Sequence, residues 1–431
     1  MGDNEITKVW ARQVLDSRGN PTVEAEVHAR SVMARGIAPS GASTGTYEAV
    51  ELRDEGRAFM GKSVQKAVGK VRGEIADLLM GMDVTDQEGL DWAMIDLDGT
   101  PNKSNLGGNA MTAVSMACAH AGAMVKKVEL HEHLGPGSRV LPVPMLNIIN
   151  GGKHAGSDLR IQEFMIVPAG AGTFSQAIRM GVEVYHNLKS ILRKEYGKGA
   201  VNVGDEGGFA PPLNTAPEVL ETIMSAIEAA GYQPGKDVSL ALDAAASEFF
   251  AEDRYTVDGK VLDSSGMVDY YEDLIDSFPL VSLEDPVDEE AFDTMAQMTE
   301  RMGDRVQLIG DDIFVTNPER VRRGIKMGAG NALLLKVNQI GTITEAFEAA
   351  KIAFEAGYNV VVSHRSGETE DTTLADIVVA LQSGQVKTGA PARAERTSKY
   401  NRLLRIEESL GSRAVYPGKE AINQRPYRPD R

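Results

Sequence analysis

The chain has 431 residues, 42% of them hydrophobic, and carries a formal net charge of −17 at pH 7. The length fits a barrel of roughly 250 residues plus a second domain, and the excess of acids argues against nucleic acid or an anionic membrane surface as a partner. The single cysteine, Cys118, excludes an intrachain disulfide, and the start, MGDNEITKV, lacks the apolar core of a secretory signal. We therefore expect a soluble, cytoplasmic protein.

The first segment, residues 6–35, has the residue pattern of β-strands, and the turn sequence SRGNP predicts that residues 6–29 form a hairpin. Apolar and polar residues alternate in TVEAEVHAR, which predicts a half-buried strand with one face in water. The next loop, APSGASTGTYEA, is either a flexible surface connection or a lid whose glycines let the backbone close over a ligand.

Residues 63–125 are predicted to be helical, with breaks near Gly81 and in TPNKSNLGGNA. The apolar run 110–125 is too short to span a bilayer, so we expect a buried helix rather than a membrane span. The Gly- and Pro-rich segment HLGPGSRVLPVP then indicates a domain boundary near residue 138. The expected domains are residues 1–138, an α+β cap, and residues 139–431, a catalytic β/α barrel.

Beyond the boundary, strand-like and helix-like segments follow one another. Strands are predicted at MLNIIN, QEFMIVP, SLALD, PLVSLED, VQLIGDD, NALLLK, YNVVVSHR and GQVKTG. Helices are predicted over 174–196 and 217–230, from the start signal Asn317-Pro318, and over 343–354 before Gly357. An insertion after Asp243 contains RYTVDGKVLD, which predicts a hairpin turning at 258–259. Such a rhythm is typical of a β/α barrel.

Three of these strands end on an acid, Asp243, Glu284 and Asp311, and a fourth ends on Lys336. A single acid after a strand is more often a helix cap or a surface residue. Three in succession followed by a lysine favour a site, because catalytic groups of β/α barrels lie just past the carboxyl ends of the strands. Oxygen ligands without a nearby histidine or cysteine favour Mg²⁺ over zinc.

A series of motifs covering essentially the whole chain resembles the glycolytic enolase family, phosphopyruvate hydratase. They are SGASTG at 40–45, NGGKHAG at 150–156, QEFM at 162–165, GDEGG at 204–208, LDAAASEF at 242–249, LEDP at 283–286, GDDIFVTN at 310–317, LLKVNQIG at 334–341, SHRSGETED at 363–371 and VKTGAPAR at 386–393. The resemblance implies an α/β fold with a small N-terminal α+β domain and a β/α barrel that starts with antiparallel strands. It also implies a lyase that reversibly dehydrates 2-phosphoglycerate to phosphoenolpyruvate.

By this resemblance Lys336 is the base that removes the α-proton, and Glu206 is the general acid for the leaving hydroxyl. Two Mg²⁺ ions are implied at each active site. Asp243, Glu284 and Asp311 would hold one, and Ser40 on the lid loop would join a second that bridges substrate carboxylate and phosphate. A lysine or histidine base working with Mg²⁺ is the known pattern of the enolase superfamily. Lys336 must be neutral to act, and we expect nearby metal and Lys387 to lower its pKa.

Other residues are implied to bind the substrate. Glu163, beside Gln162, would lie near the leaving hydroxyl with Glu206, and two close carboxylates should raise one pKa. Lys387 would pair with the substrate carboxylate, and Arg365 and Ser366 would take the phosphate, where a guanidinium fork is suited better than an ammonium. Two histidines, His154 and His364, would lie close to the substrate.

Two other functions fit parts of the sequence. A relative in the superfamily that acts on a non-phosphorylated carboxylate would share the acids, but Arg365-Ser366 and the Ser40 loop argue against it. A binding or structural role, as some relatives also serve, can coexist with catalysis, and some relatives also occur at the cell surface or secreted. The resemblance further implies a homodimer, or an octamer built from dimers.

Overall fold

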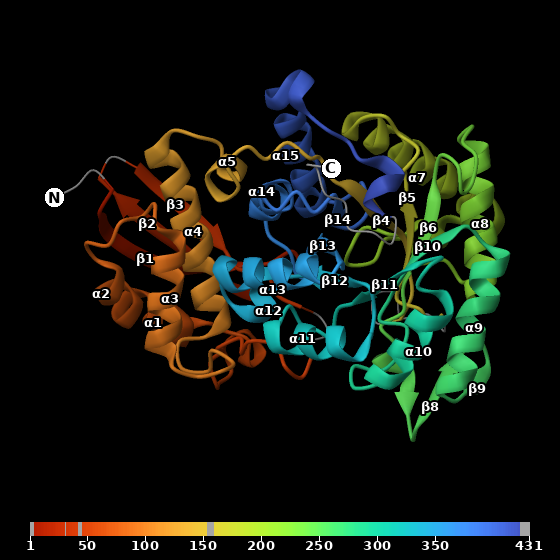
Figure 1. Cartoon of the computed structure of the whole chain (residues 1–431), viewed down its shortest axis with the longest axis horizontal. Coiled ribbons are helices and arrows are strands. Elements are labelled where there is room, and N and C mark those ends of the chain that lie inside the picture. The colour runs from red at the N-terminus through yellow and green to blue at the C-terminus, as the bar shows by residue number, and fades with distance from the viewer. Residues whose placement is uncertain (1–3, 31, 42–44, 153–158, 423–431) are drawn as a thin grey trace.

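A computed structural model describes residues 4–30, 32–41, 45–152 and 159–422. Its elements form two parts, at the left and right of Figure 1. The left part begins with an antiparallel sheet in the order β1-β2-β3. Its strands are β1 (Ile6–Leu15), β2 (Pro21–Ala29) and β3 (Val32–Ile37). Its helices are α1 (Gln65–Lys70), α2 (Ala76–Leu79), α3 (Gln87–Asp98), α4 (Gly108–Lys126) and α5 (Leu130–Leu134). The predicted hairpin over residues 6–29 is therefore confirmed.

The prediction of a wet face on β2 is wrong. Glu24 and Glu26 are only 8% and 7% exposed. Their cross-strand partners are Arg12 on β1 and Arg35 on β3. Arg12 pairs with both carboxylates, and Arg35 Nε donates to Glu26 Oε2 at 3.3 Å. Because β2 is the central strand, long cationic side chains from both neighbouring strands cover these acids, which the alternating pattern had predicted to be exposed to solvent.

Helix α4 is the buried helix expected from the apolar run 110–125, and it packs on this sheet. A Cβ added to Gly36 of β3 would lie 2.5 Å from the Ala113 carbonyl oxygen, so only glycine allows this approach. The sheet, α4 and the preceding helices enclose one hydrophobic core. The N-terminal part therefore buries apolar surface of its own.

The right part is built on a closed eight-stranded barrel, in the order β4-β5-β6-β10-β11-β12-β13-β14. The strands are β4 (Val143–Asn150), β5 (Glu163–Val167), β6 (Ser239–Asp243), β10 (Leu280–Glu284), β11 (Gln307–Gly310), β12 (Ala332–Leu335), β13 (Asn359–Ser363) and β14 (Gln385–Lys387). Strand β5 is antiparallel to β4 and β6, and the other neighbours are parallel. The barrel with an antiparallel start is confirmed.

Helices surround the barrel. They are α7 (Phe174–Tyr196), α8 (Ala216–Ala229), α9 (Ser264–Ser277), α10 (Phe292–Met302), α11 (Pro318–Met327), α12 (Val337–Ile340), α13 (Ile343–Glu355), α14 (Thr373–Ala380) and α15 (Ala394–Leu410). Side chains alternate along each strand: Ala332 and Leu334 of β12 join a core of inward residues, whereas Leu333 and Leu335 join the core under the helices. Short 3₁₀ or π turns occur at 58–61, 71–75, 198–201, 246–249, 411–413 and 418–421.

The insertion after β6 forms a small separate sheet of β7 (Phe250–Ala251), β8 (Arg254–Val257) and β9 (Lys260–Leu262). Its hairpin turns at Asp258 and Gly259, both with positive φ (49° and 71°), as a two-residue turn between twisted strands requires. The predicted hairpin is confirmed.

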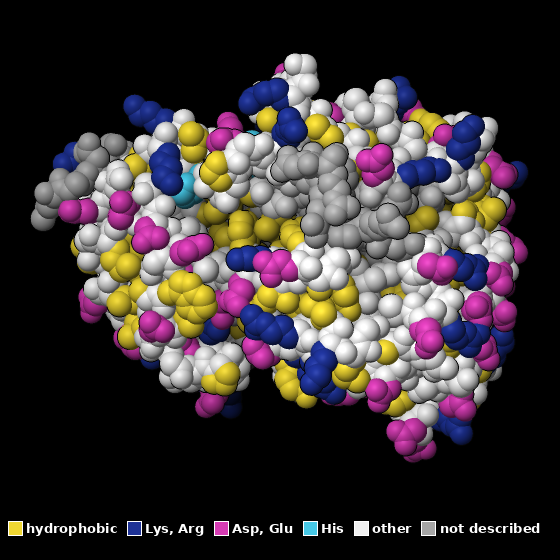
Figure 2. Space-filling model, in the orientation of Figure 1, with side chains coloured by type: hydrophobic (Ala, Val, Ile, Leu, Met, Phe, Trp, Pro, Cys, Tyr) yellow, Lys and Arg dark blue, Asp and Glu magenta, His cyan; other side chains and the backbone are white. Residues whose placement is uncertain are grey.

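Among the described residues, no helix is long and apolar enough to cross a membrane. On the face shown in Figure 2, acidic and basic side chains are interspersed, and neither sign gathers into a large patch. The net negative charge of the chain is therefore not concentrated on this face.

Candidate active site

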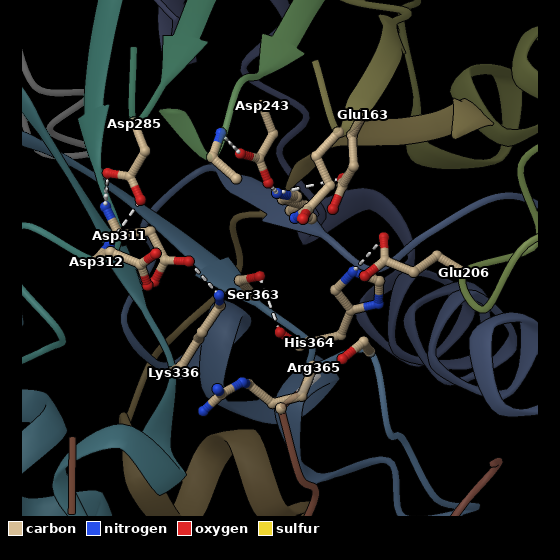
Figure 3. Close-up of a pocket in the computed structure, with 15 residues that line it drawn as sticks. Glu163, Glu206, Asp243, Asp285, Asp311, Asp312, Lys336, Ser363, His364 and Arg365 are labelled. Atoms are coloured by element: carbon tan, nitrogen blue, oxygen red, sulfur yellow. Dashed lines mark hydrogen bonds and ion pairs between the residues drawn. The ribbon is translucent and has the colours of Figure 1, made fainter. Parts of the chain in front are cut away.

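The predicted strand-end residues meet at one rim of the barrel. Asp243 and Glu284 end the parallel strands β6 and β10 and are register partners, while Asp311 and Lys336 directly follow β11 and β12. Glu163 is the first residue of the antiparallel β5 and pairs in register with Asp243. The strand directions therefore bring all five to the same end of the barrel, where Figure 3 shows a cluster of charged side chains.

Lys387, the last residue of β14, binds the acids of three other strands. Its Nζ donates to Asp243 Oδ2 at 2.7 Å and to both Glu284 oxygens at 2.8 Å, and it lies 3.2 Å from Glu163 Oε2. Burial alone would lower the Lys387 pKa, but the surrounding carboxylates outweigh it and hold the pKa well above its usual value. Lys387 is therefore a buried ammonium whose charge the surrounding carboxylates stabilise.

Lys336 donates its Nζ hydrogen bond to Asp311 Oδ2. Burial and the neighbouring Arg365 and Lys387 lower the Lys336 pKa, but the nearby carboxylates, Asp311 first and then Glu284, raise it, and the net shift is upward. Lys387 lowers this pKa as expected, but the protein groups together shift it upward, and the lowering expected from a bound metal stays a prediction. The second oxygen of Asp311, Oδ1, accepts from Gln339 Nε2 at 2.8 Å.

Two further acids join Asp311. Asp285, Asp311 and Asp312 each offer an oxygen within 4.8 Å of the others. Asp285 accepts the backbone N–H groups of Asp311 at 2.9 Å and of Asp312 at 2.7 Å, so it also fixes the loop. Burial and the charge of Asp311 raise the pKa of Asp312 to about 8. Asp285 and Asp312 were not among the predicted site residues, although the paired acids in LEDP and GDDIF were a signal.

Glu206 lies on the loop 204–208, close to Asn147, His364 and the buried acid Glu163. Asn147 of β4 donates Nδ2–H to Glu206 Oε2 at 3.0 Å, and His364 Nε2 lies 3.3 Å from the same oxygen. Burial and the nearby Glu206 raise the pKa of Glu163 well above its usual value, which confirms that one of the two carboxylates is shifted upward. Asn147 was missed; an asparagine within the apolar run MLNIIN was its only signal.

Arg365 follows β13 and faces Glu48. Its Nη1 and Nη2 donate to the two Glu48 oxygens at 2.9 and 3.0 Å, and Nη1 also donates to Asn338 Oδ1 at 3.2 Å. Glu48 belongs to the N-terminal part, just after the 40–45 loop, and was not predicted. This bidentate pair ties the small domain to the rim of the barrel.

The outcome differs among three further predicted residues, Gln162, Ser40 and His154. Gln162 lies in the wall of the pocket beside Glu163. Ser40 donates its hydroxyl to Glu51 Oε2 at 3.0 Å and lines a neighbouring hollow instead of the central pocket. His154 lies outside the described residues. The structure thus brings Gln162 to the cluster and does not bring the Ser40 hydroxyl there.

The central pocket is small, with a cavity volume of about 30 Å³. Its described lining consists of Gly41, Gln162, Glu163, Glu206, Asp243, Ala245, Asp285, Asp311, Asp312, Lys336, Ser363, His364, Arg365, Ser366 and Lys387. No strand of the inserted β7–β9 sheet is among them. Carboxylates outnumber basic groups in this wall, and all of these acids offer oxygen, so the donor set fits a hard divalent cation such as Mg²⁺.

Comparison with known proteins agrees with this geometry. A family model described as "Enolase, N-terminal domain" matches residues 6–134, and one described as "Enolase, C-terminal TIM barrel domain" matches residues 138–425. The chain is 56% identical over 422 residues to the enolase of Thermococcus gammatolerans, covering 97% of this chain and 98% of that protein. It is 57% identical over 409 residues to the enolase of Methanocaldococcus jannaschii, covering 94% and 96%.

Proposed function

The chain belongs to the enolase family and dehydrates 2-phosphoglycerate reversibly to phosphoenolpyruvate, and from this premise we propose that Lys336 and Glu206 perform its two proton transfers. Lys336 removes the α-proton, and Glu206 protonates the leaving hydroxyl. The observation that carries the assignment is their placement: both are buried in the wall of one pocket and lie on opposite sides of it (Figure 3). A base and an acid on opposite sides can act on two neighbouring carbons of one substrate.

Mg²⁺ is the proposed cofactor, with two ions per site. Asp243, Glu284 and Asp311 would hold one ion, and Asp312 extends the same oxygen-rich rim. When bound, the metal would supply the positive charge that stabilises a doubly anionic carboxylate and would offset the Asp311 charge that raises the Lys336 pKa. Ser40 is the residue proposed for the second ion, and it would have to leave Glu51 to reach it.

The remaining side chains orient the substrate. Lys387, a cation stabilised by the rim acids, would pair with the substrate carboxylate. Arg365 and Ser366 would bind the phosphate, because a guanidinium can donate two parallel hydrogen bonds to it. Glu48 now accepts from both terminal nitrogens of Arg365, so phosphate would compete with this carboxylate. Gln162 and Glu163 would lie beside the leaving hydroxyl.

His154 is proposed to lie near the substrate by its place in NGGKHAG alone. We also propose a domain boundary near residue 138, supported by the Gly- and Pro-rich segment between α5 and β4. A homodimer, or an octamer of dimers, and a cytoplasmic location follow from the family and complete the proposal. Light scattering of the purified chain tests the assembly.

The base assignment is tested with Lys336→Ala. Purified wild-type protein should form the ultraviolet-absorbing enol product from 2-phosphoglycerate when Mg²⁺ is present. In Lys336→Ala, exchange of the substrate α-proton with deuterated solvent should fall about 10,000-fold, the upper range for a positioned general base. Exchange that continues at the wild-type rate would exclude Lys336 as the base.

A further inference from the structure

Arg396, near the start of α15, is fully buried and joins two loops of the active site. Its Nη1 donates to the Arg365 carbonyl oxygen at 2.6 Å, and its Nη2 donates to the carbonyl oxygens of Ser366 at 2.6 Å and Asp205 at 3.1 Å. One loop therefore carries the phosphate-binding residues and the other carries Glu206.

The same guanidinium fixes the protonation of His364. Arg396 Nη1 lies 2.6 Å from His364 Nδ1. A guanidinium only donates hydrogen bonds, so Nδ1 must be the unprotonated, accepting nitrogen. Burial lowers the pKa of His364 to about 4, so the ring is neutral near pH 7 and carries its one hydrogen on Nε2.

That Nε2–H faces the acid. His364 Nε2 lies 3.3 Å from Glu206 Oε2, which also accepts the Asn147 amide hydrogen at 3.0 Å (Figure 3 shows the histidine and the glutamate). In a protonated carboxyl group one oxygen carries the hydrogen and the other accepts. The Asn147 amide donates to Oε2 and His364 Nε2–H lies closest to the same oxygen, so Oε2 is the side that accepts and the hydrogen is placed on Oε1.

We propose that Arg396 is a positioning residue that acts through His364 to place the transferable proton of Glu206 on Oε1. This inference rests on the proposed role of Glu206 as the general acid. It extends that role by naming the oxygen that delivers the proton and the buried arginine that selects it. A purely structural Arg396 would tie the two loops together without affecting the tautomer of His364.

Nitrogen-15 NMR of the whole protein, labelled in histidine, tests the tautomer without any turnover. His364→Gln identifies the His364 signals by their loss. Near pH 7 the wild-type spectrum should show Nε2 protonated and Nδ1 unprotonated. A ring protonated on Nδ1 would overturn the proposal, even if the protein is fully active. An inactive protein with the expected tautomer would instead count against the role of Glu206.

Variants of Arg396 test the link to catalysis. Arg396→Met removes every donor at similar length, so His364 should populate the Nδ1–H form and dehydration should fall about 100-fold, the scale of an ångström-sized misplacement. The α-proton exchange should stay near the wild-type rate. Arg396→Lys keeps a donor for Nδ1 and should retain more of the Nε2–H form and of the dehydration rate.

Arg402→Met is the matched control, because Arg402 lies on the same helix and pairs with Asp376 and Glu129 away from the pocket. It should leave the tautomer and both rates unchanged. Equal loss of exchange and dehydration in Arg396→Met, or an unchanged tautomer there, would show that Arg396 is only structural. Should Arg396→Met fail to fold, the wild-type spectrum and Arg396→Lys still decide the question.

Discussion

The two sides of the pocket hold their acids in different ways (Figure 3). On the side of Lys336, the acids neighbour other acids: burial and nearby carboxylates raise the pKa values of Glu284 and Asp312. On the side of Glu206, the neutral Asn147 amide donates to one carboxylate oxygen, His364 Nε2 lies 3.3 Å from the same oxygen, and Glu163 is the neighbouring acid. The Lys336 side therefore gathers buried negative charge, whereas the Glu206 side is positioned by the hydrogen bond from Asn147.

This difference suggests a division of labour. Like charges buried together are costly unless a cation joins them, so the Lys336 side should respond strongly to a bound metal. Neutral donors cost little to bury when they are paired, so the Glu206 side should keep its geometry with or without metal. We expect the charge state of the Lys336 side to change when metal binds, and the Glu206 side to hold one transferable proton in a fixed position.

Among the tests that compare the two sides of the pocket, removal of divalent metal should have the largest effect, and it should affect the Lys336 side only. After chelation and gel filtration, α-proton exchange should fall by about 1,000-fold or more, because charge stabilisation by a metal is worth several kcal/mol. The His364 nitrogen signals should stay the same. Readdition of Mg²⁺ should restore the exchange. A shift of the His364 signals on chelation would contradict the claim that the Glu206 side keeps its geometry without metal.

Arg365→Lys should have an intermediate effect and lies outside both proton transfers. Loss of the guanidinium fork should raise KM for 2-phosphoglycerate about tenfold to a hundredfold, as expected for charge-assisted hydrogen bonds worth 1.5 to 3 kcal/mol. The ratio of exchange to dehydration should stay at the wild-type value. Steady-state kinetics and exchange on the same preparation check both. A kcat loss with unchanged KM would contradict a role in phosphate binding.

The smallest effect concerns stability and pH. The folded pKa of His364, about 4, lies below its unfolded value near 6.5. The contribution of neutral His364 to the free energy of unfolding is fully present above pH 6.5. It is lost as the pH falls toward 4, because in that range the unfolded chain binds the proton and the folded chain does not. Urea unfolding should show that the free energy of unfolding of the wild-type protein falls from pH 7 to pH 5. This fall should be roughly 2 kcal/mol smaller in His364→Gln. The exposed His186, changed to Gln, should leave the loss unaltered.

The strand-end residues could be predicted because β/α barrels place such groups at one rim, so Asp243 and Lys336 needed no knowledge of their neighbours. Asp285 and Arg396 could not. Each looks ordinary in its segment, a second acid after a strand and a cation in a charged helix, and its role depends on partners far along the chain. The prediction of an exposed face on β2 was wrong for the same reason, because Arg12 on another strand covers Glu24.

The raised pKa of Lys336 shows a further limit. The sequence placed a base among acids and other cations, but the sign of the shift depends on which neighbour is nearest. The nearby carboxylates, with Asp311 in direct hydrogen-bond contact, outweigh Lys387 and Arg365. Distances, which no residue pattern supplies, decide such balances.

Glu206→Gln, followed by NMR in deuterated buffer with 2-phosphoglycerate and Mg²⁺, tests the separation of base and acid most directly. Glutamine keeps the shape and the accepting oxygen but has no proton to deliver, so the α-proton should still exchange while phosphoenolpyruvate formation falls about 1,000-fold. An equal loss of exchange and product formation would contradict the separate roles of Lys336 and Glu206.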